Sequence, residues 1–91
     1  MDFNERMEAR KVSEDEKFVV YQYGHLNSKE KMTGELKISN NELPSVSTVN
    51  LERGYTTRAN EMRIGGKIIL DHMISGEWPE FVELAKKIAV K

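Results

Sequence analysis

Apolar and polar residues alternate along the first half of the chain, with the period of strands that have one face in a core and one in water. Residues 17–24 are rich in aromatic and β-branched side chains, and in residues 32–39 every second position is apolar or glycine. Residues 46–52 fit a further strand, whereas residues 5–12 suit either an edge strand or a short helix. We therefore predict an antiparallel meander of three or four strands over these segments.

The period changes to that of a helix from residue 57 onward. One stripe recurs at spacings of three and four residues, and it consists of Ala59, Met62, Gly66, Ile69 and Met73. Gly65 and Gly66 oppose a helix, because each costs about 1 kcal/mol relative to alanine, and the sequence around them also fits a tight hairpin. The stripe continues past both glycines, so we favour a single helix over 57–75 and keep the hairpin as the alternative.

The last part of the chain has the signals of a second helix over 79–90. Pro79 stands in the first turn, acidic residues come early, and lysines come late. Strands followed by helices, with no alternation of the two, predict an α+β fold with both helices on one face of the sheet. A chain of 91 residues fits a single domain, 1–91, with residues 1–4 and 91 frayed.

Composition narrows the functional classes. The chain has 14 basic and 15 acidic residues and a net charge of −1, which disfavours strong binding to phosphates. It has no cysteine, which excludes disulfides, thiolate catalysis and cysteine-bound zinc. The charged start does not match a signal peptide, and the longest aliphatic run, residues 68–70, is too short to cross a bilayer. We expect a soluble, cytoplasmic protein that makes no contact with a membrane.

No catalytic or metal-binding motif stands out. The two histidines, His25 and His72, are far apart in sequence, and Asp71, next to His72, does not share its helix face. We expect His72 to be a solvated histidine on a polar face. The Gly-Gly-Lys sequence ending at Lys67 lacks the remaining positions of a phosphate-binding loop. We therefore predict no catalytic residue, no cofactor and no metal, and an enzyme built around His72 or His25 is only an alternative.

Two surface hypotheses remain. Ile64 and Ile68 point away from the helical stripe, so either the second helix covers them or they form a contact surface. The candidate partner interface consists of Ile64, Ile68, Arg63, Lys67 and His72. We accordingly expect a non-enzymatic protein that binds a macromolecule, either another protein or a second copy of itself as a homodimer.

Nucleic-acid binding is the alternative. It rests on the locally basic segment 53–67, whose candidate contacts are Arg53, Tyr55, Arg58, Arg63 and Lys67.

Overall fold

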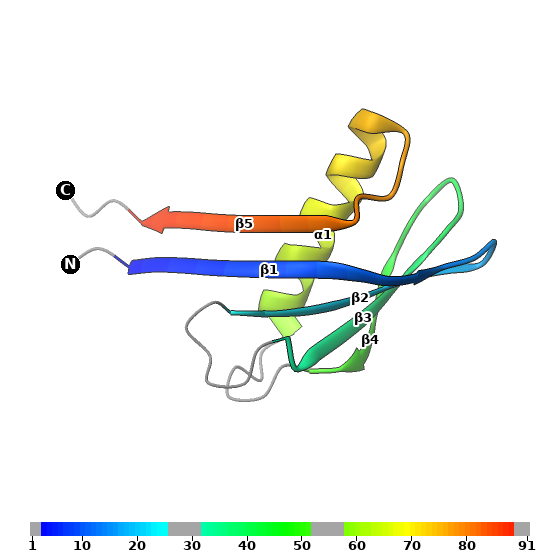
Figure 1. Ribbon diagram of the computed structural model, residues 1–91. Helices are drawn as coiled ribbons and strands as arrows, with labels where there is room; N and C mark the ends of the chain where they lie inside the picture. The colour runs from blue at the N-terminus through cyan, green and yellow to red at the C-terminus, as the bar shows by residue number, and fades with distance from the viewer. Residues whose placement is uncertain (1–2, 26–31, 52–57, 89–91) are drawn as a thin grey trace.

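The computed structural model describes residues 3–25, 32–51 and 58–88 of the chain. Its fold is α+β: one five-stranded antiparallel sheet with one helix packed on it (Figure 1). The elements are, in chain order, β1 (Phe3–Glu14), β2 (Phe18–His25), β3 (Gly34–Ser39), β4 (Val46–Asn50), α1 (Arg58–Ser75) and β5 (Phe81–Ile88). The strands lie in the order β4-β3-β2-β1-β5.

The first four strands form the predicted meander. The segment 5–12 is a strand within β1, so its helical alternative is wrong, and the other three predicted strands coincide with β2, β3 and β4 to within a few residues. The turn between β1 and β2 is closed by Asp15, whose carboxylate accepts hydrogen bonds from the backbone N–H groups of Phe18 and Lys17 at 2.8 and 2.7 Å. These two bonds, Phe18 first, lower the pKa of Asp15 because they favour the charged carboxylate.

The prediction of a second helix over 79–90 is wrong within the described residues. The segment forms β5, which pairs antiparallel with β1 from Arg10↔Phe81 to Phe3↔Ile88. The second edge of β1 carries backbone N–H and C=O groups that require hydrogen-bond partners. Pairing with β5 over eight positions satisfies them, and this outweighs the local preference of the segment for a helix. Residues 89 and 90, with 1, 2 and 91, lie outside the described residues.

Helix α1 confirms the prediction of one helix through both glycines, and the hairpin alternative is wrong. Its orientation, however, differs from the expected one. Ile64 and Ile68 are fully buried against the sheet, whereas Met62 and Met73 of the predicted core stripe are exposed. Both sides of this helix are apolar, and packing places the side with Gly65 toward the sheet because the missing side chain lets the helix approach Val46 closely.

The core lies between α1 and one face of the sheet. Its side chains come from alternate positions of the strands, from the inward side of α1 and from the segment before β5. They are Met7, Ala9, Val19, Tyr21, Tyr23, Leu36, Ile38, Val46, Ile64, Ile68, Trp78 and Val82. Within the described residues, α1 is not apolar enough over its length to span a membrane.

The twin glycines should respond to alanine in opposite ways. A Cβ at Gly65 would lie 2.6 Å from a methyl carbon of Val46, so Gly65→Ala should lower the free energy of unfolding by about 1–3 kcal/mol through overpacking. A Cβ at Gly66 would meet no atom of the described residues within 4 Å, so Gly66→Ala should raise the free energy of unfolding by about 0.5–1 kcal/mol through helix propensity. Urea unfolding followed by circular dichroism at low protein concentration measures both changes. Equal effects at the two positions would contradict the observed orientation of α1.

Candidate functional site

The outward side of α1 carries a concentrated set of exposed apolar side chains. Met62, Leu70, Met73 and Ile74 are 47%, 52%, 72% and 77% exposed. At about 100° per residue these four positions and Gly66 lie within an arc of about 120°. We call this surface, Met62, Gly66, Leu70, Met73 and Ile74, the outer face of α1. Soluble domains seldom leave so many large apolar side chains together in water.

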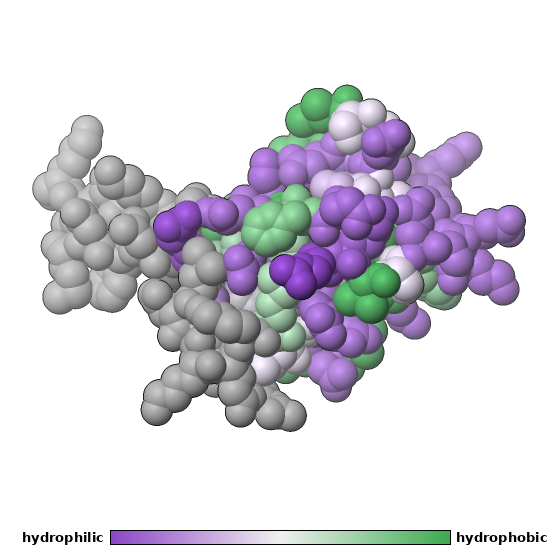
Figure 2. Space-filling view, viewed as in Figure 1, coloured by the Kyte–Doolittle hydropathy of each residue, from purple (hydrophilic) through white to green (hydrophobic). Residues whose placement is uncertain are grey.

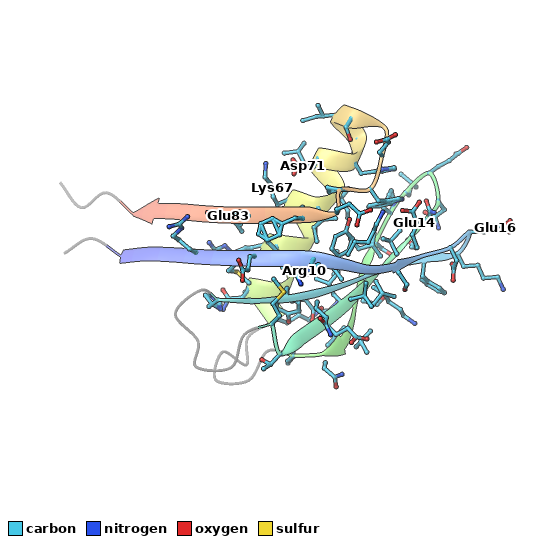
Figure 3. The ribbon with its side chains drawn as sticks, in the orientation of Figure 1. Arg10, Glu14, Glu16, Lys67, Asp71 and Glu83 are labelled. Carbon is cyan, nitrogen blue, oxygen red and sulfur yellow. The ribbon has the colours of Figure 1, made fainter. Side chains whose placement is uncertain are left out.

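Charged residues lie along one flank of the outer face. The Nζ atom of Lys67 is 3.0 Å from Oδ1 of Asp71, one turn further along the helix, and Figure 3 shows the two side chains next to each other. Arg63 donates to Asn60 Oδ1 at 3.3 Å on the same side of the helix. Since Lys67 is matched by a carboxylate, this flank has no marked surplus of positive charge.

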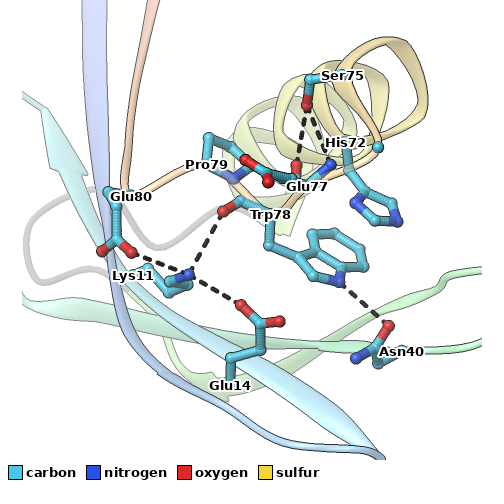
Figure 4. Close-up of a pocket in the computed structure, with 10 residues that line it drawn as sticks. Lys11, Glu14, Asn40, His72, Ser75, Glu77, Trp78, Pro79 and Glu80 are labelled. Atoms are coloured by element: carbon cyan, nitrogen blue, oxygen red, sulfur yellow. Dashed lines mark hydrogen bonds and ion pairs between the residues drawn. The ribbon is translucent and has the colours of Figure 1, made fainter.

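A pocket of about 580 Å³ opens beside the C-terminal end of α1 (Figure 4). Three parts of the chain line it: the end of β1, the β3–β4 connection, and the segment from the end of α1 to β5. The lining residues are Lys11, Glu14, Asn40, His72, Ser75, Gly76, Glu77, Trp78, Pro79 and Glu80. Gly76 ends the helix with a positive φ of 83°, a conformation in which glycine is unstrained, and its N–H bonds the carbonyl of His72 at 2.7 Å.

An aromatic pair forms the inner wall of the pocket. The His72 imidazole is parallel to the buried indole of Trp78, with ring centroids 3.8 Å apart. The indole nitrogen of Trp78 donates to Asn40 Oδ1 at 3.1 Å, which fixes the ring against the β3–β4 connection. The expectation that His72 is a solvated polar-face residue is therefore wrong. Its Nδ1 atom is buried and has no hydrogen-bond partner within the part of the chain that the structure describes.

The single lysine in the pocket is held by its neighbours. The Lys11 ammonium contacts Glu14 at 2.8 Å, Glu80 at 3.0 Å and the Trp78 carbonyl at 3.4 Å. The hydrogen bonds to Glu14 and Glu80 raise the pKa of Lys11. An ammonium has three donors, so these contacts occupy Lys11 and leave it poorly placed to bind an added anion.

Tyr21 lies behind the pocket and ties β2 to the start of β5. Its hydroxyl donates to the carbonyl of Pro79 at 2.5 Å. Burial raises the pKa of Tyr21, and the charges of Glu14, Glu80 and Asp71 raise it further, since each disfavours a phenolate nearby. Two of these carboxylates, Glu14 and Glu80, are the ones that hold the Lys11 ammonium.

A second buried polar group lies at the other end of α1. Glu61 is fully buried, and its carboxylate accepts hydrogen bonds from Thr48 at 2.6 Å and from the Tyr23 hydroxyl at 3.2 Å. Arg58 completes the network, because its guanidinium bonds Thr48 and lies 3.5 Å from Glu61. The sequence pattern did not indicate this side chain, whose two oxygens are hydrogen-bonded as those of a buried polar group must be.

The structure separates the predicted interface residues. Ile64 and Ile68 belong to the core, so their expected place on the surface is wrong, and a partner cannot reach them in this fold. At 100° per residue Arg63 lies within the arc of the outer face, between Leu70 and Ile74, and Lys67 lies just beside it, while His72 lines the pocket. The sequence pattern does not identify the outer face as a surface, because Met62, Gly66 and Met73 belong to the helical stripe found in the sequence, and such a stripe usually packs into a core.

Within the described residues, the structure does not bring the candidate nucleic-acid contacts together. Arg53 and Tyr55 lie outside the described residues. Arg58 is engaged with Thr48 and Glu61, and Lys67 with Asp71. None of these observations supports a basic patch on α1.

The uncovered face of the sheet is mostly hydrophilic. In the view of Figures 1 and 2, β1 and β5 pass in front of α1, and hydrophobic residues form only separate patches. Phe18 has Lys37 over its ring at 4.6 Å, and Phe81 is opposite Arg10 in the β1–β5 register.

In the described residues no group of three or more histidine or acidic side chains is placed to hold a metal ion.

No protein-family model, curated protein or solved structure matches this chain.

The Tyr21 hydroxyl should make the protein sensitive to alkali. Its pKa is raised in the folded state, so the unfolded state loses this proton first, and stability falls as the pH rises above about 10. We expect a loss of about 1 kcal/mol per pH unit in the free energy of unfolding between pH 10 and 11.5. Urea titrations at each pH check this.

Tyr21→Phe is the matched variant. Its free energy of unfolding should fall less steeply with pH above pH 10. Some pH dependence should remain in the variant. The pKa of Lys11 is also raised in the folded state, so the stability that its ion pairs provide is lost as the lysine deprotonates at high pH. Identical slopes in the two proteins would show that Tyr21 ionises equally in both states.

Proposed function

We propose that this protein is a protein-binding module whose binding element is the outer face of α1. The observation that carries the proposal is the exposure of Met62, Leu70, Met73 and Ile74 on one arc of a helix whose opposite side already fills the core. Burying an apolar side chain stabilises an assembly by about 25 cal/mol per Å² removed from water. Association with a partner that covers this surface is therefore favourable. An exposed helix with apolar side chains one turn apart is a common protein-recognition element.

The charges around the outer face favour a protein over a polyanion. A nucleic acid would require unpaired basic residues along the helix. Here Lys67 has Asp71 at 3.0 Å, and the chain carries one more acidic than basic residue. A protein partner requires only apolar contact and a balanced rim, and the flank of α1 provides such a rim.

A site-specific photo-cross-linker tests this proposal. Benzoylphenylalanine at Leu70 should form covalent adducts with a protein, in purified samples or in extract, and Ile74→Glu should abolish them. The control is the same cross-linker at Val12, which is 53% exposed on β1 against 52% for Leu70. Adducts at position 70 no more abundant than at position 12 would refute the proposal.

A second candidate function is the binding of a small organic cation in the pocket. It is favoured by three carboxylates, Glu14, Glu77 and Glu80, around a single lysine whose donors are occupied. The C-terminal end of α1 forms one wall, and the negative end of a helix dipole also favours a cation. A pocket of about 580 Å³ is within the size range of sites for small molecules. An alkylguanidinium or alkylammonium group would pair with the carboxylates beside the His72–Trp78 stack.

Trp78 is the only tryptophan, so its fluorescence reports directly on the pocket. Agmatine should change the emission with saturation, whereas the dianion succinate should not. The double variant Glu77→Gln/Glu80→Gln should bind agmatine about tenfold more weakly, equivalent to about 1.4 kcal/mol. Glu42→Gln, an exposed position outside the pocket, serves as the control. An unchanged affinity in the double variant, or equal binding of succinate, would contradict cation binding.

A further inference from the structure

We infer that the outer edge of β5 pairs with the same edge of a second copy of this chain, so that two five-stranded sheets join into one across a two-fold axis. This inference concerns a sheet edge and not the outer face of α1, so it does not depend on the proposed function. It names the partner and the register in which the two strands meet.

The first observation is that β5 presents a long and regular edge. It is the last strand in the order β4-β3-β2-β1-β5, and Figure 1 shows no other strand along its outer side. Its eight-residue register with β1 has no shift, whereas the β1–β2 and β3–β4 registers each contain one. Bulges and prolines keep an edge strand from pairing with another chain, and β5 has neither.

The second observation is that the backbone of β5 directs every second residue outward. The N–H of Lys11 donates to the carbonyl of Glu80 at 2.9 Å, and this pair continues the β1–β5 register by one position. In an antiparallel pair, opposite residues that exchange hydrogen bonds alternate with opposite residues that do not. The even-numbered residues of β5 therefore bond β1, and the backbone groups of residues 81, 83, 85 and 87 point to the outer edge. An added antiparallel strand can bond them.

The third observation selects a second copy as the added strand. A two-fold axis normal to the sheet can pass through residue 85 of both copies. It then places Glu83 of each copy opposite Lys87 of the other, on the same face of the joined sheet. Opposite charges at directly opposed positions stabilise a strand pair. Glu83 also bonds Arg6 of β1, and a carboxylate can accept from both cations.

Other positions of the axis are less favourable. An axis through residue 83 places two glutamates opposite each other, and an axis through residue 86 does the same with two lysines. An axis through residue 84 leaves Glu83 opposite Ala85, with no charge to match it. Lysines usually protect an edge strand from pairing, but in the register centred on residue 85 Lys87 has a matching carboxylate. The charges of β5 therefore favour this one antiparallel register.

Sedimentation equilibrium of the full chain tests the inference. Wild-type protein should reach twice the mass of the 10.5 kDa chain as its concentration rises. Ala85→Pro should weaken association by about tenfold or more, because proline removes an N–H that the second copy needs and β1 does not. Ala85→Ser keeps this N–H and is the matched control, so it should associate as the wild type does. Circular dichroism should show the same fold in all three proteins.

A charge reversal tests the register and does not depend on the folding of the proline variant. Lys87→Glu should weaken association, because it places two glutamates opposite each other twice. The double variant Lys87→Glu/Glu83→Lys should restore association, because the reciprocal pairing is regained with opposite signs.

The chain has no cysteine, so a single introduced thiol also reports on the register. Ala85→Cys should form a disulfide-linked dimer on mild oxidation, because the axis brings the two Cα atoms of this position to about 5.5 Å. Val12→Cys, at a position 53% exposed on β1, is the control and should remain a monomer.

A wild-type chain that stays monomeric at high concentration overturns the inference. A dimer that persists unchanged in Ala85→Pro or in Lys87→Glu, or that Ala85→Cys does not cross-link, has its contact elsewhere and overturns it as well. The cross-linker at Leu70 reports on the outer face of α1, so its result decides the proposed function separately.

Discussion

The close approach of α1 to the sheet at Gly65 determines much of this molecule. A side chain at this position would collide with Val46, so glycine allows the helix to lie at a distance that buries Ile64 and Ile68 together. The same rotation of the helix places the carboxylate of Glu61 between Tyr23 and Thr48. It also leaves the next residue, Gly66, exposed to solvent. One packing contact therefore defines both the core and the outer face.

The β1–β5 pairing is the other long-range constraint. Helix α1 carries the chain from β4, at one edge of the sheet, across its face to β5 at the other. The segment that turns back from α1 to β5 brings Trp78 under His72 and the Pro79 carbonyl to the Tyr21 hydroxyl. The pocket exists because this turn, the β1–β2 hairpin and the β3–β4 connection converge at one end of the sheet. Three carboxylates line it, Glu14 from β1 and Glu77 and Glu80 from the segment between α1 and β5.

The two candidate surfaces have different chemistry. The outer face is apolar and open, and it carries a balanced pair of charges on its flank. The pocket is concave and polar, and it contains a lysine whose contacts are internal. The outer face lies on α1 alone, whereas the helix contributes only His72 and Ser75 to the pocket. They meet at the last turn of α1, where His72 and Ser75 of the pocket alternate with Met73 and Ile74 of the outer face, so Met62 and Glu80 are the positions that separate the two surfaces best.

Much of the fold was accessible from local pattern. Alternation identified the strand segments 17–24 and 32–39, and the helix was correctly continued through Gly65 and Gly66 because its apolar spacing persisted. By contrast, 79–90 has residues acceptable in a helix or a strand. Its conformation was decided by the unpaired edge of β1, which is distant in sequence. A short window contains no information about such an edge.

The candidate site was determined mainly by tertiary structure. The sequence itself determined that α1 has apolar residues on two sides and that no metal-binding or catalytic motif is present. It did not determine which side faces the sheet, because Ile64 and Ile68 are as apolar as Met62 and Met73. The orientation of the helix followed from the fit of Gly65 in α1 against Val46 in β4, two residues that are far apart in sequence. The sequence specifies the apolar sides of a helix, whereas packing decides which of them stays in water.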